Sequence, residues 1–577
     1  MADPAKQQIR HLRLRAIFGE KAKGKIYRHD PWPAEATGYK AKETAAWRVH
    51  APMLKALDVE AVIAYAKDKV PPDLYERALL AQRILSDETL WKPSFTTMEV
   101  PKSRVHRRVA QAMVSNGILV EMETGNAFIN NSLQIDNKEC PQPKAWGLLS
   151  TKPEPHKDPP RLRVISDMLW SNWALDDMVK TSFSSQAQLD AKLRARYGAT
   201  FDFTGWYYAL PVREAVGEYL AVRVGNKIYR HARAPMGHKW MVFAAHTLTQ
   251  VIAWTPHLQH DVIIDNVMYS AEDERLLRRE CDAFVSRAAL FNATIGEATG
   301  PSRSITYRGM VAHMGETVTV KRTWAEKCTR RIDYVLTRKA TAAQIYSIGG
   351  MLAWLRGIVP IEGLEDYHLW KDIARAANSS PDRRMTLHAA PLQALKTIQT
   401  ILEAKELPTR KLSEPPRPRA IMITDASLAR PLGRWGAIVV TTRIRAMAGL
   451  FPIPLFRVAS IADLEMAAVL LALSLVPLNN RNIVLLIDNQ SACRVLEKRR
   501  SCAWRLHMFG KAIHARVSSL GSSLQARWLP SAKNPADGIS RGKAITQADL
   551  AQALSLAHEF GVVPEGIGLN SEIEKRE

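Results

Sequence analysis

Two acidic residues stand where a folded chain could hold them rigidly. Asp265 lies in the run 262–270, in which apolar residues flank an Asp265-Asn266 pair. This pattern predicts a short β-hairpin with a carboxylate at its tip, because Asn266 at the second turn position would tolerate the left-handed backbone of a tight turn. An ordinary surface hairpin with an Asp-Asn turn fits the same pattern. The run 199–212 is typical of a β-strand with one acid, Asp202, followed by Gly205 and a cluster of aromatic residues.

These two acids could share a metal ion. Two carboxylates about 4 Å apart repel each other by roughly 4 kcal/mol at an effective dielectric constant of about 20, so they form a costly pair when no cation is present. Carboxylate oxygens are also the ligands that Mg²⁺ prefers in proteins. If Asp202 and Asp265 meet on adjacent strands, a shared metal ion is the natural resolution.

Four further acids occur in the C-terminal part of the chain, each beside a recognisable element. Each acid alone fits a helix cap or an exposed surface residue as well as it fits an active site. Asp425 follows the apolar run 421–424, Glu465 opens a helical pattern at 463–468, Asp488 follows the apolar strand pattern 483–487, and Asp537 closes the stretch 528–537.

The elements that must position Asp202 and Asp265 resemble the palm of reverse transcriptases. The stretch around Asp202 resembles motif A of that family, and Asp265-Asn266 resembles motif C, which reads Tyr-x-Asp-Asp. Other motifs follow in the family's order. Residues 162–167 with Asn172 resemble the fingers motif, 234–238 with Phe243 resemble motif B, Tyr307-Arg308-Gly309 resembles the primer grip, and 348–354 resemble the thumb helix.

This resemblance implies roles for the metal-binding and sugar-sensing residues. Asp202 and Asp265 would bridge two Mg²⁺ or Mn²⁺ ions, with the backbone carbonyl of Phe203 as a further ligand and Asn266 at the place of the second Asp. Tyr207 stands where the family has its steric gate, a ring that excludes a 2′-hydroxyl and so favours deoxynucleotides. A strand-core aromatic residue is the alternative for Tyr207.

The resemblance also implies a set of nucleotide and primer contacts. Arg163 would bind the triphosphate of a deoxynucleoside triphosphate, and Lys152 and Lys157 compete for the neighbouring lysine position; a solvated basic turn is the alternative for both lysines. The remaining implied residues are Met236 and Gly237 beside the nucleotide, and Arg308 and Gly309 in the primer grip.

Three departures from the family pattern bear on activity. Asn266 removes one negative charge from motif C, although an amide oxygen is still a possible Mg²⁺ ligand. Trp206 replaces a small residue in motif A, and Met236 replaces the motif B Gln. A catalytically decayed, retroelement-derived nucleic-acid-binding protein is therefore the alternative to an active polymerase.

The four C-terminal acids resemble the active site of ribonuclease H. Thr424-Asp425-Ala426-Ser427, followed by Trp435-Gly436-Ala437, is similar to the first strands of that domain. The resemblance implies that Asp425, Glu465, Asp488 and Asp537 hold two metal ions and cut the RNA strand of an RNA–DNA hybrid, which the 2′-hydroxyl would mark. Many family members carry a mobile His in the loop before the last Asp, and here that loop reads Pro-Ser-Ala-Lys.

Composition is consistent with a nucleic-acid partner. The formal net charge is +23 and the isoelectric point is near 9.8, and Lys and Arg gain free energy by displacing counterions from phosphates. Acidic substrates or a membrane surface could use the same charge. The five cysteines show no CxxC pair, which argues against a zinc module or a disulfide framework. It is consistent with a reducing compartment. No apolar run is long enough to span a membrane, and there is no apolar signal core, so we expect a cytoplasmic or nuclear protein without membrane contact.

The predicted fold class is α+β and multidomain: a right-hand polymerase with fingers, palm and thumb, followed by an RNase H-like α/β domain with a mixed sheet. The expected partners are an RNA template, a DNA primer, the RNA–DNA hybrid and deoxynucleoside triphosphates, with the oligomeric state left open. The predicted boundaries are 1–98 for a basic, mostly helical extension, 99–320 for fingers and palm, 321–403 for thumb and connection, 404–419 for a proline-rich linker, 420–545 for the RNase H-like domain, and 546–577 for a C-terminal helix and tail.

The order of these parts also suggests a class of element. We find no aspartic-protease motif ahead of the polymerase motifs and no integrase motif after the RNase H motifs. This layout resembles tyrosine-recombinase retrotransposons of the DIRS and VIPER type, or pararetroviruses.

Overall fold

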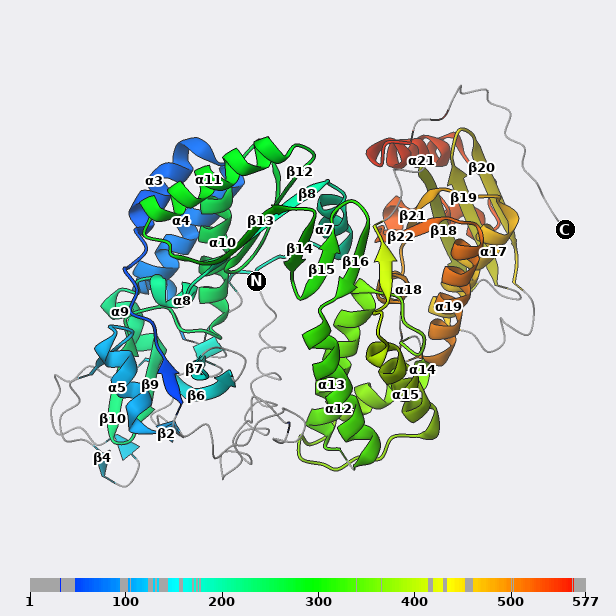
Figure 1. The fold of residues 1–577 in the computed structure, drawn as a ribbon. Coiled ribbons are helices and arrows are strands. Elements are labelled where there is room, and N and C mark those ends of the chain that lie inside the picture. Colours follow the sequence, from blue (N-terminus) through cyan, green and yellow to red (C-terminus); the bar gives the residue numbers. More distant parts are fainter. Residues whose placement is uncertain are drawn as a thin grey trace.

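The computed structural model is a mixed α+β structure with several separate sheets (Figure 1), as the sequence predicts. Among the described residues, no helix combines the length and the apolarity needed to cross a bilayer. The structure describes residue 32 and residues 47–564, except 94–101, 104, 123–127, 130–131, 134–143, 155–158, 169–170, 173–174, 176–177, 339, 365, 413–418, 429–432, 452–459, 500, 502 and 563.

The outer sheet lies at one end of the molecule (Figure 1). Its first strand pairs in parallel with the next strand of the sheet and falls within 1–98, for which the sequence predicts mostly helix. Helix α5 (Arg107–Ser115) packs on this sheet and ends at Asn116-Gly117, where Gly117 has a positive φ. The strands, in spatial order, are β1 (Arg48–His50), β7 (Arg161–Asp167), β6 (Trp146–Glu154), β9 (Ala221–Val224), β10 (Lys227–His231) and β3 (Leu119–Glu121), with β2 (Lys102–Ser103) beside β9.

The central sheet is antiparallel and carries Asp202 and the Asp265 hairpin. The rings of Phe201, Tyr269 and Phe284 meet in the core between this sheet and its covering helices. The N-terminal helices contribute to the same core, so they are built into this part of the molecule. The strand order is β11 (Gln259–Ile263), β12 (Asn266–Ala271), β8 (Tyr197–Phe203) and β13 (Ile295–Ser302), and the helices are α3 (Val59–Lys69), α4 (Pro72–Ser86), α8 (Trp206–Ala209), α10 (Lys239–Ala253) and α11 (Glu274–Leu290).

A small sheet and a group of helices follow. The last strand of the small sheet lies within 404–419, where the sequence predicts a linker throughout; Thr409–Lys411 instead pairs with the preceding strand and extends the sheet. Within that predicted linker, residues 413–418 lie outside the described residues, and residue 419 already belongs to the next strand. The strands are β14 (Ser304–Tyr307), β15 (Met310–His313), β16 (Thr317–Val320) and β17 (Thr409–Lys411), and the helices are α7 (Gln186–Leu193), α12 (Arg322–Thr337), α13 (Ala342–Ile358), α14 (Tyr367–Ala377) and α15 (Ala389–Glu403).

The C-terminal sheet is mixed, as predicted, and its central strand pairs antiparallel on one side and parallel on the other. That strand is apolar on both faces, because Met422 packs toward one helical layer and Ile421 and Ile423 toward the other. The strand order is β20 (Ile444–Leu450), β19 (Arg434–Val440), β18 (Arg419–Ser427), β21 (Asn482–Ile487) and β22 (Ser523–Trp528), and the helices are α17 (Ile461–Leu475), α18 (Gln490–Lys498), α19 (Trp504–Ser519), α20 (Asp537–Ser540) and α21 (Gln547–Glu559).

Candidate active sites

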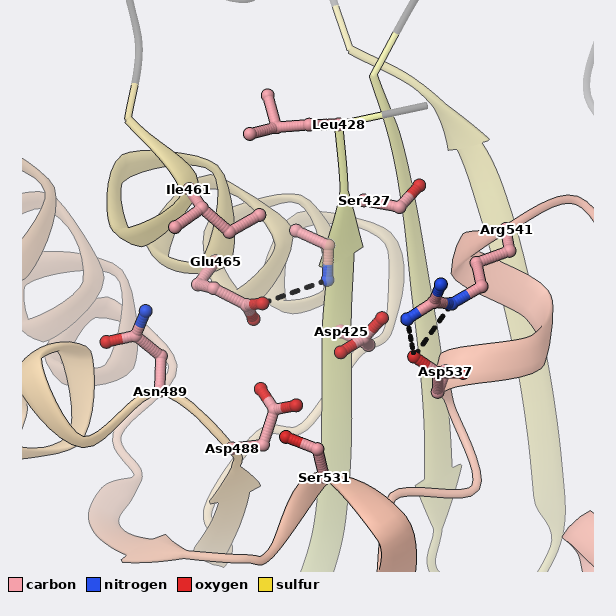
Figure 2. Close-up of a pocket in the computed structure, with 11 residues that line it drawn as sticks. Asp425, Ser427, Leu428, Ile461, Glu465, Asp488, Asn489, Ser531, Asp537 and Arg541 are labelled. Atoms are coloured by element: carbon pink, nitrogen blue, oxygen red, sulfur yellow. Dashed lines mark hydrogen bonds and ion pairs between the residues drawn. The ribbon is translucent and has the colours of Figure 1, made fainter. Parts of the chain in front are cut away.

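The C-terminal sheet gathers acids from separate elements at one edge (Figure 2). Asp425 lies on β18, Glu465 on α17 and Asp488 directly after β21, and one ligand atom from each lies within 4.8 Å of the others. The strands β18 and β21 run parallel and adjacent, so the acids near their carboxyl ends meet at the same edge of the sheet. Asp537, at the start of α20, lines the same cavity of about 530 Å³.

Burial and mutual repulsion make these carboxylates hard to ionise together. The side chains of Asp425 and Glu465 are almost fully buried. Burial, followed by the charges of Asp425 and Asp488, raises the pKa of Glu465 to about 9. Burial also raises the pKa of Asp425 to about 6, with Asp488 and Asp537 adding to the shift. This arrangement favours a bound cation or a bound proton.

Hydrogen bonds hold the acids in place. The amide of Asn534 donates to the Asp425 carboxylate (3.3 Å), and the Ser540 hydroxyl donates to its other oxygen. Glu465 accepts the backbone N–H of Ala426 (3.3 Å). Asp537 accepts two hydrogen bonds from the Arg541 guanidinium, at 2.9 and 2.7 Å, as Figure 2 shows. Asn534, Ser540 and Arg541 therefore form a supporting layer for the acids that the sequence reasoning did not assign.

A glycine explains how α20 reaches the acids. A Cβ on Gly436 would lie 2.7 Å from the Ile539 side chain and 2.8 Å from the backbone nitrogen of Ser540. Only a residue without a side chain lets α20 approach β19 this closely. Gly436 lies directly opposite Asp425 in the β18–β19 ladder, so the close contact brings Ser540 to the acid.

The central sheet places Asp202 and Asp265 side by side. Asp202 lies directly opposite Asn266 in the β8–β12 ladder, and the backbone N–H of Phe203 donates to the carbonyl of Asp265 (3.0 Å). Burial raises the pKa of the Asp265 carboxyl, while a hydrogen bond from the Asn266 amide (3.0 Å) and the charge of Arg163 oppose that shift. The two predicted acids thus meet at one sheet edge.

The turn that carries Asp265 differs from its prediction. Ile263 pairs with Asn266, so the two turn residues are Ile264 and Asp265, and the left-handed residue is Ile264, with φ of 56°. Asn266 is an ordinary strand residue. A β-branched residue is rarely found at positive φ, and the N–H of Ile264 donates to the ring Nδ1 of His246 on α10 (3.3 Å). Burial lowers the pKa of His246 to about 4, so its ring is neutral at pH 7 and can accept this bond.

The residues predicted to hold a nucleotide lie around this tip. Arg163 and Lys152 are directly opposed in the β6–β7 ladder and share one face of it. Like charges in opposed positions destabilise a strand pair unless an anion is near, and Glu154 lies 3.6 Å from the Arg163 guanidinium. Tyr207 is half-buried on α8; burial and the nearby charge of Asp265 raise its pKa. Lys157 lies outside the described residues.

The predicted motif B loop is fixed by the predicted fingers motif. The amide of Asn172 donates to the carbonyl of Gly237 (2.7 Å) and accepts the N–H of Lys239 (2.8 Å). Gly237 has φ of 86°, and a Cβ there would lie 2.7 Å from the Ser166 carbonyl oxygen. Met236 packs against the core of the outer sheet. The loop therefore lies tightly across β7, which carries Arg163.

The predicted primer grip is the turn between β14 and β15. Arg308 and Gly309 have φ of 51° and 78°, the pattern of a type I′ hairpin turn. They line a cavity of about 610 Å³ together with Asn266 and with Trp354, which lies on α13. The predicted motif C, primer grip and thumb helix thus border one space.

Comparisons with known proteins give a weak structural likeness. No protein-family model matches the sequence, and no curated protein matches it. A foamy viral protease-reverse transcriptase in complex with an RNA/DNA hybrid is similar with a TM-score of 0.44 and 12% identity over 82% of this chain and 64% of that one. The same viral enzyme in complex with dsDNA gives a TM-score of 0.44 and 11% identity over 83% of this chain and 99% of that one. At this level the likeness assigns no residue of this chain a role.

Proposed function

We propose that this chain is an RNA-directed DNA polymerase with ribonuclease H activity. The observation that carries the proposal is the presence of separate acidic sites on separate sheets, each at a strand edge beside a cavity. One consists of Asp425, Glu465 and Asp488, and the other is formed by Asp202 and the Asp265 hairpin. In this proposal the outer sheet is the fingers, the central sheet is the palm, and helices α12 and α13 are the thumb.

The donor set of the C-terminal site fits Mg²⁺ or Mn²⁺. All donors are carboxylate oxygens, and one from each of Asp425, Glu465 and Asp488 lies within 4.8 Å of the others, which is close to the limit of about 4.2 Å for two ligands that are about 2.1 Å from one ion. We assign Asp425, Glu465, Asp488 and the more exposed Asp537 to two ions. When bound, these ions would supply an activated water and charge neutralisation at the leaving 3′-oxygen.

The residues of the C-terminal site have distinct tasks in this proposal. Asn534 and Ser540 orient Asp425, because each donates a hydrogen bond to one of its oxygens. Glu465, whose pKa is raised to about 9, would give up its proton when the site fills, because a nearby cation lowers the pKa of a carboxyl group. Arg541, at the rim of the cavity, neutralises Asp537 and presents a cation to an RNA phosphate.

The hairpin site would align a primer and a nucleotide. Asp202 and Asp265 would hold Mg²⁺ or Mn²⁺, and Asn266 would offer an amide oxygen. Phosphoryl transfer depends mainly on positioning and on neutralising phosphate charge, so Arg163 and Lys152 are assigned to the triphosphate. Tyr207, whose ring lies near enough to Asp265 to sense its charge, is assigned to the 2′-position of the sugar.

One observation favours a second function. Asn266 donates a hydrogen bond to Asp265 (3.0 Å) and so satisfies the carboxylate without a metal ion. A chain that binds nucleic acid but no longer synthesises DNA would keep the basic charge of +23 and this hairpin. We therefore keep a retroelement-derived nucleic-acid-binding protein as the alternative.

Primer extension and hybrid cleavage, scored in parallel, test the proposal. Asp202→Asn or Asp265→Asn is expected to lower extension by about 100-fold or more while cleavage continues, because metal ligands matter at least as much as their supporting residues. Asp425→Asn or Asp488→Asn is expected to do the reverse. Glu497→Gln, on the exposed face of α18, is the matched control and should change neither activity.

The outcomes separate the candidate functions. Wild-type protein that binds hybrid but neither extends a primer nor cleaves RNA with Mg²⁺ or Mn²⁺ would support the binding protein. Undiminished extension by both hairpin variants would show that the polymerase site lies elsewhere.

A further inference from the structure

A buried ionic cluster, separate from the acidic sites, surrounds Asp261. This residue lies on β11, and its carboxylate is fully buried. It contacts Lys192 Nζ at 2.7 Å, Arg308 Nη2 at 2.9 Å and the Tyr307 hydroxyl at 3.0 Å. Burial opposes ionisation, yet these partners outweigh it and hold the pKa of Asp261 below its ordinary value. Asp261 is therefore a buried anion.

The cluster joins two hairpins that are far apart in sequence. Asp261 belongs to the β11–β12 hairpin, which carries Asp265 at its tip. Tyr307 and Arg308 belong to the β14–β15 hairpin. Lys192, on α7, braces the junction, and both cations also contact Ser184: Lys192 donates to its hydroxyl (3.2 Å), and Arg308 to its carbonyl (3.0 Å).

The joined hairpins border the same cavity. Asn266 reaches it from one hairpin, and Arg308 and Gly309 reach it from the other. The Arg308 guanidinium, however, turns inward to Asp261, and the Arg308 side chain is only 15% exposed. The Arg308 side chain thus fixes the Arg308-Gly309 turn, and this turn faces the cavity.

An apolar residue at position 261 could fill the same space, and replacing buried ion pairs by apolar groups is often neutral for stability. The hydrogen bonds that Asp261 accepts from Lys192 and Tyr307 fix both distance and direction, which apolar packing does not. A displacement of about 1 Å near reacting atoms can cost about 100-fold in rate. A fixed spacing between these hairpins would therefore matter more for catalysis than for folding.

We propose that Asp261 is a positioning residue, which sets the spacing between the Asp265 turn and the Arg308-Gly309 turn and thereby places the primer 3′ end. This inference rests on the proposed polymerase function. In this role Asp261 touches neither the primer nor the nucleotide, and it acts through Arg308 and Tyr307.

The test uses Asp261→Asn in the full-length chain. We expect kcat for primer extension to fall about 10- to 100-fold, as for residues that support a metal site, with the KM for the nucleotide and the Kd for the hybrid unchanged within about 2-fold. RNA cleavage in the same preparation should be unchanged, since the C-terminal site is separate.

A matched control comes from the same helix. Asp190 on α7 makes a bidentate ion pair with Arg410 of β17, at 2.8 Å for both contacts, and this pair does not involve the β11–β12 hairpin. Asp190→Asn should leave extension within about 2-fold of wild type. An equal loss in both variants would mean that α7 acts only as a general support, and this result would overturn the inference.

A milder variant guards against misfolding. Tyr307→Phe removes one hydrogen bond to the Asp261 carboxylate without changing the ring, and we expect a roughly 2- to 5-fold loss in kcat in a chain that still folds, as a cooperative melting transition would show. Wild-type kcat in both Asp261→Asn and Tyr307→Phe would overturn the positioning role alone. A wild-type chain that extends no primer would overturn the proposed polymerase together with this inference.

Discussion

Replacing Glu465 by Gln should stabilise the metal-free C-terminal domain relative to wild type, and this gain should grow as the pH rises. The pKa of Glu465 is about 9 in the folded chain, against an ordinary value of 4.5. The folded state therefore holds an extra proton between these values, and the free energy of unfolding falls as the pH rises through that window. A Gln side chain has a similar shape and needs no proton, so the variant escapes this loss.

The size of the effect follows from the shift. At pH 8 the pH lies about 3.5 units above the ordinary pKa of Glu465, and keeping the proton over each unit costs the folded state roughly 1.4 kcal/mol. The upper limit of the effect is therefore about 5 kcal/mol. Relaxation around the site and coupling to Asp425 reduce that limit, so we expect a gain of about 2–4 kcal/mol at pH 8 and less than about 1 kcal/mol at pH 5.

Hydrogen exchange of the β18 and α17 backbone, in EDTA at pH 5, 6.5 and 8, measures this gain in the intact chain. Glu497→Gln makes the same side-chain replacement on an exposed surface and should show no such pH-dependent gain. Added Mg²⁺ should protect wild type more than Glu465→Gln, since the variant lacks one ligand. A gain in stability that is equal at pH 5 and pH 8, or a loss of stability at pH 8, would refute the claim that Glu465 stays protonated in the folded, metal-free chain.

Three further predictions concern the hairpin site and the charge of the chain. Tyr207→Val should admit ribonucleotides during extension, measured as kcat/KM for ribo- against deoxynucleotides; unchanged discrimination would assign the ring to the core. His246→Leu keeps the bulk but loses the acceptor for the Ile264 N–H, so extension should slow by roughly 10-fold at unchanged hybrid affinity, and a wild-type rate would contradict that role. Affinity for duplex DNA should fall with salt, with a log–log slope of about −0.9 for each phosphate neutralised; a slope near zero would show that the charge serves another purpose.

The C-terminal acids could be predicted because each follows a strong local pattern. Asp425 lies near the end of an apolar strand, Asp488 directly follows one, and Glu465 lies on an apolar helix. Parallel neighbours place their carboxyl ends together, so strand order alone brings two of these acids to one edge. Their supports could not be predicted in the same way. Asn534 and Ser540 reach Asp425 only because Gly436 admits α20, and that is a property of tertiary packing.

The hairpin shows where local preference fails. Asn266 is the residue that a tight turn prefers, yet it pairs opposite Asp202 and leaves the left-handed position to Ile264. The pairing of β12 with β8 fixes the register, since a slip of one residue would turn every β12 side chain to the other face. Left-handed backbone costs an ordinary residue roughly 1–2 kcal/mol, which the register and the bond to His246 offset.

Asp261 was beyond sequence reasoning for a different reason. A single acid in a strand pattern gives no sign of its partners, and here they come from α7 and from the β14–β15 hairpin. Nothing in the local pattern distinguishes this buried anion from an exposed strand residue. Long-range pairs of this kind follow from the arrangement of sheets and helices, and the periodicity of the sequence does not predict that arrangement.

Within the proposed polymerase function, the geometry around Asn266 gives this residue a role at the hairpin site. An Asp at 266 would lie directly opposite Asp202 and next to Asp265, which would place three carboxylates at a half-buried strand edge. Arg163 is the cation whose charge acts on Asp265 there. The amide removes that repulsion in the metal-free state, donates a hydrogen bond to Asp265, and keeps an oxygen that a hard cation can bind. Within that proposal, Asn266 lowers the charge of the hairpin site relative to an Asp, and metal affinity is the property that it would change first.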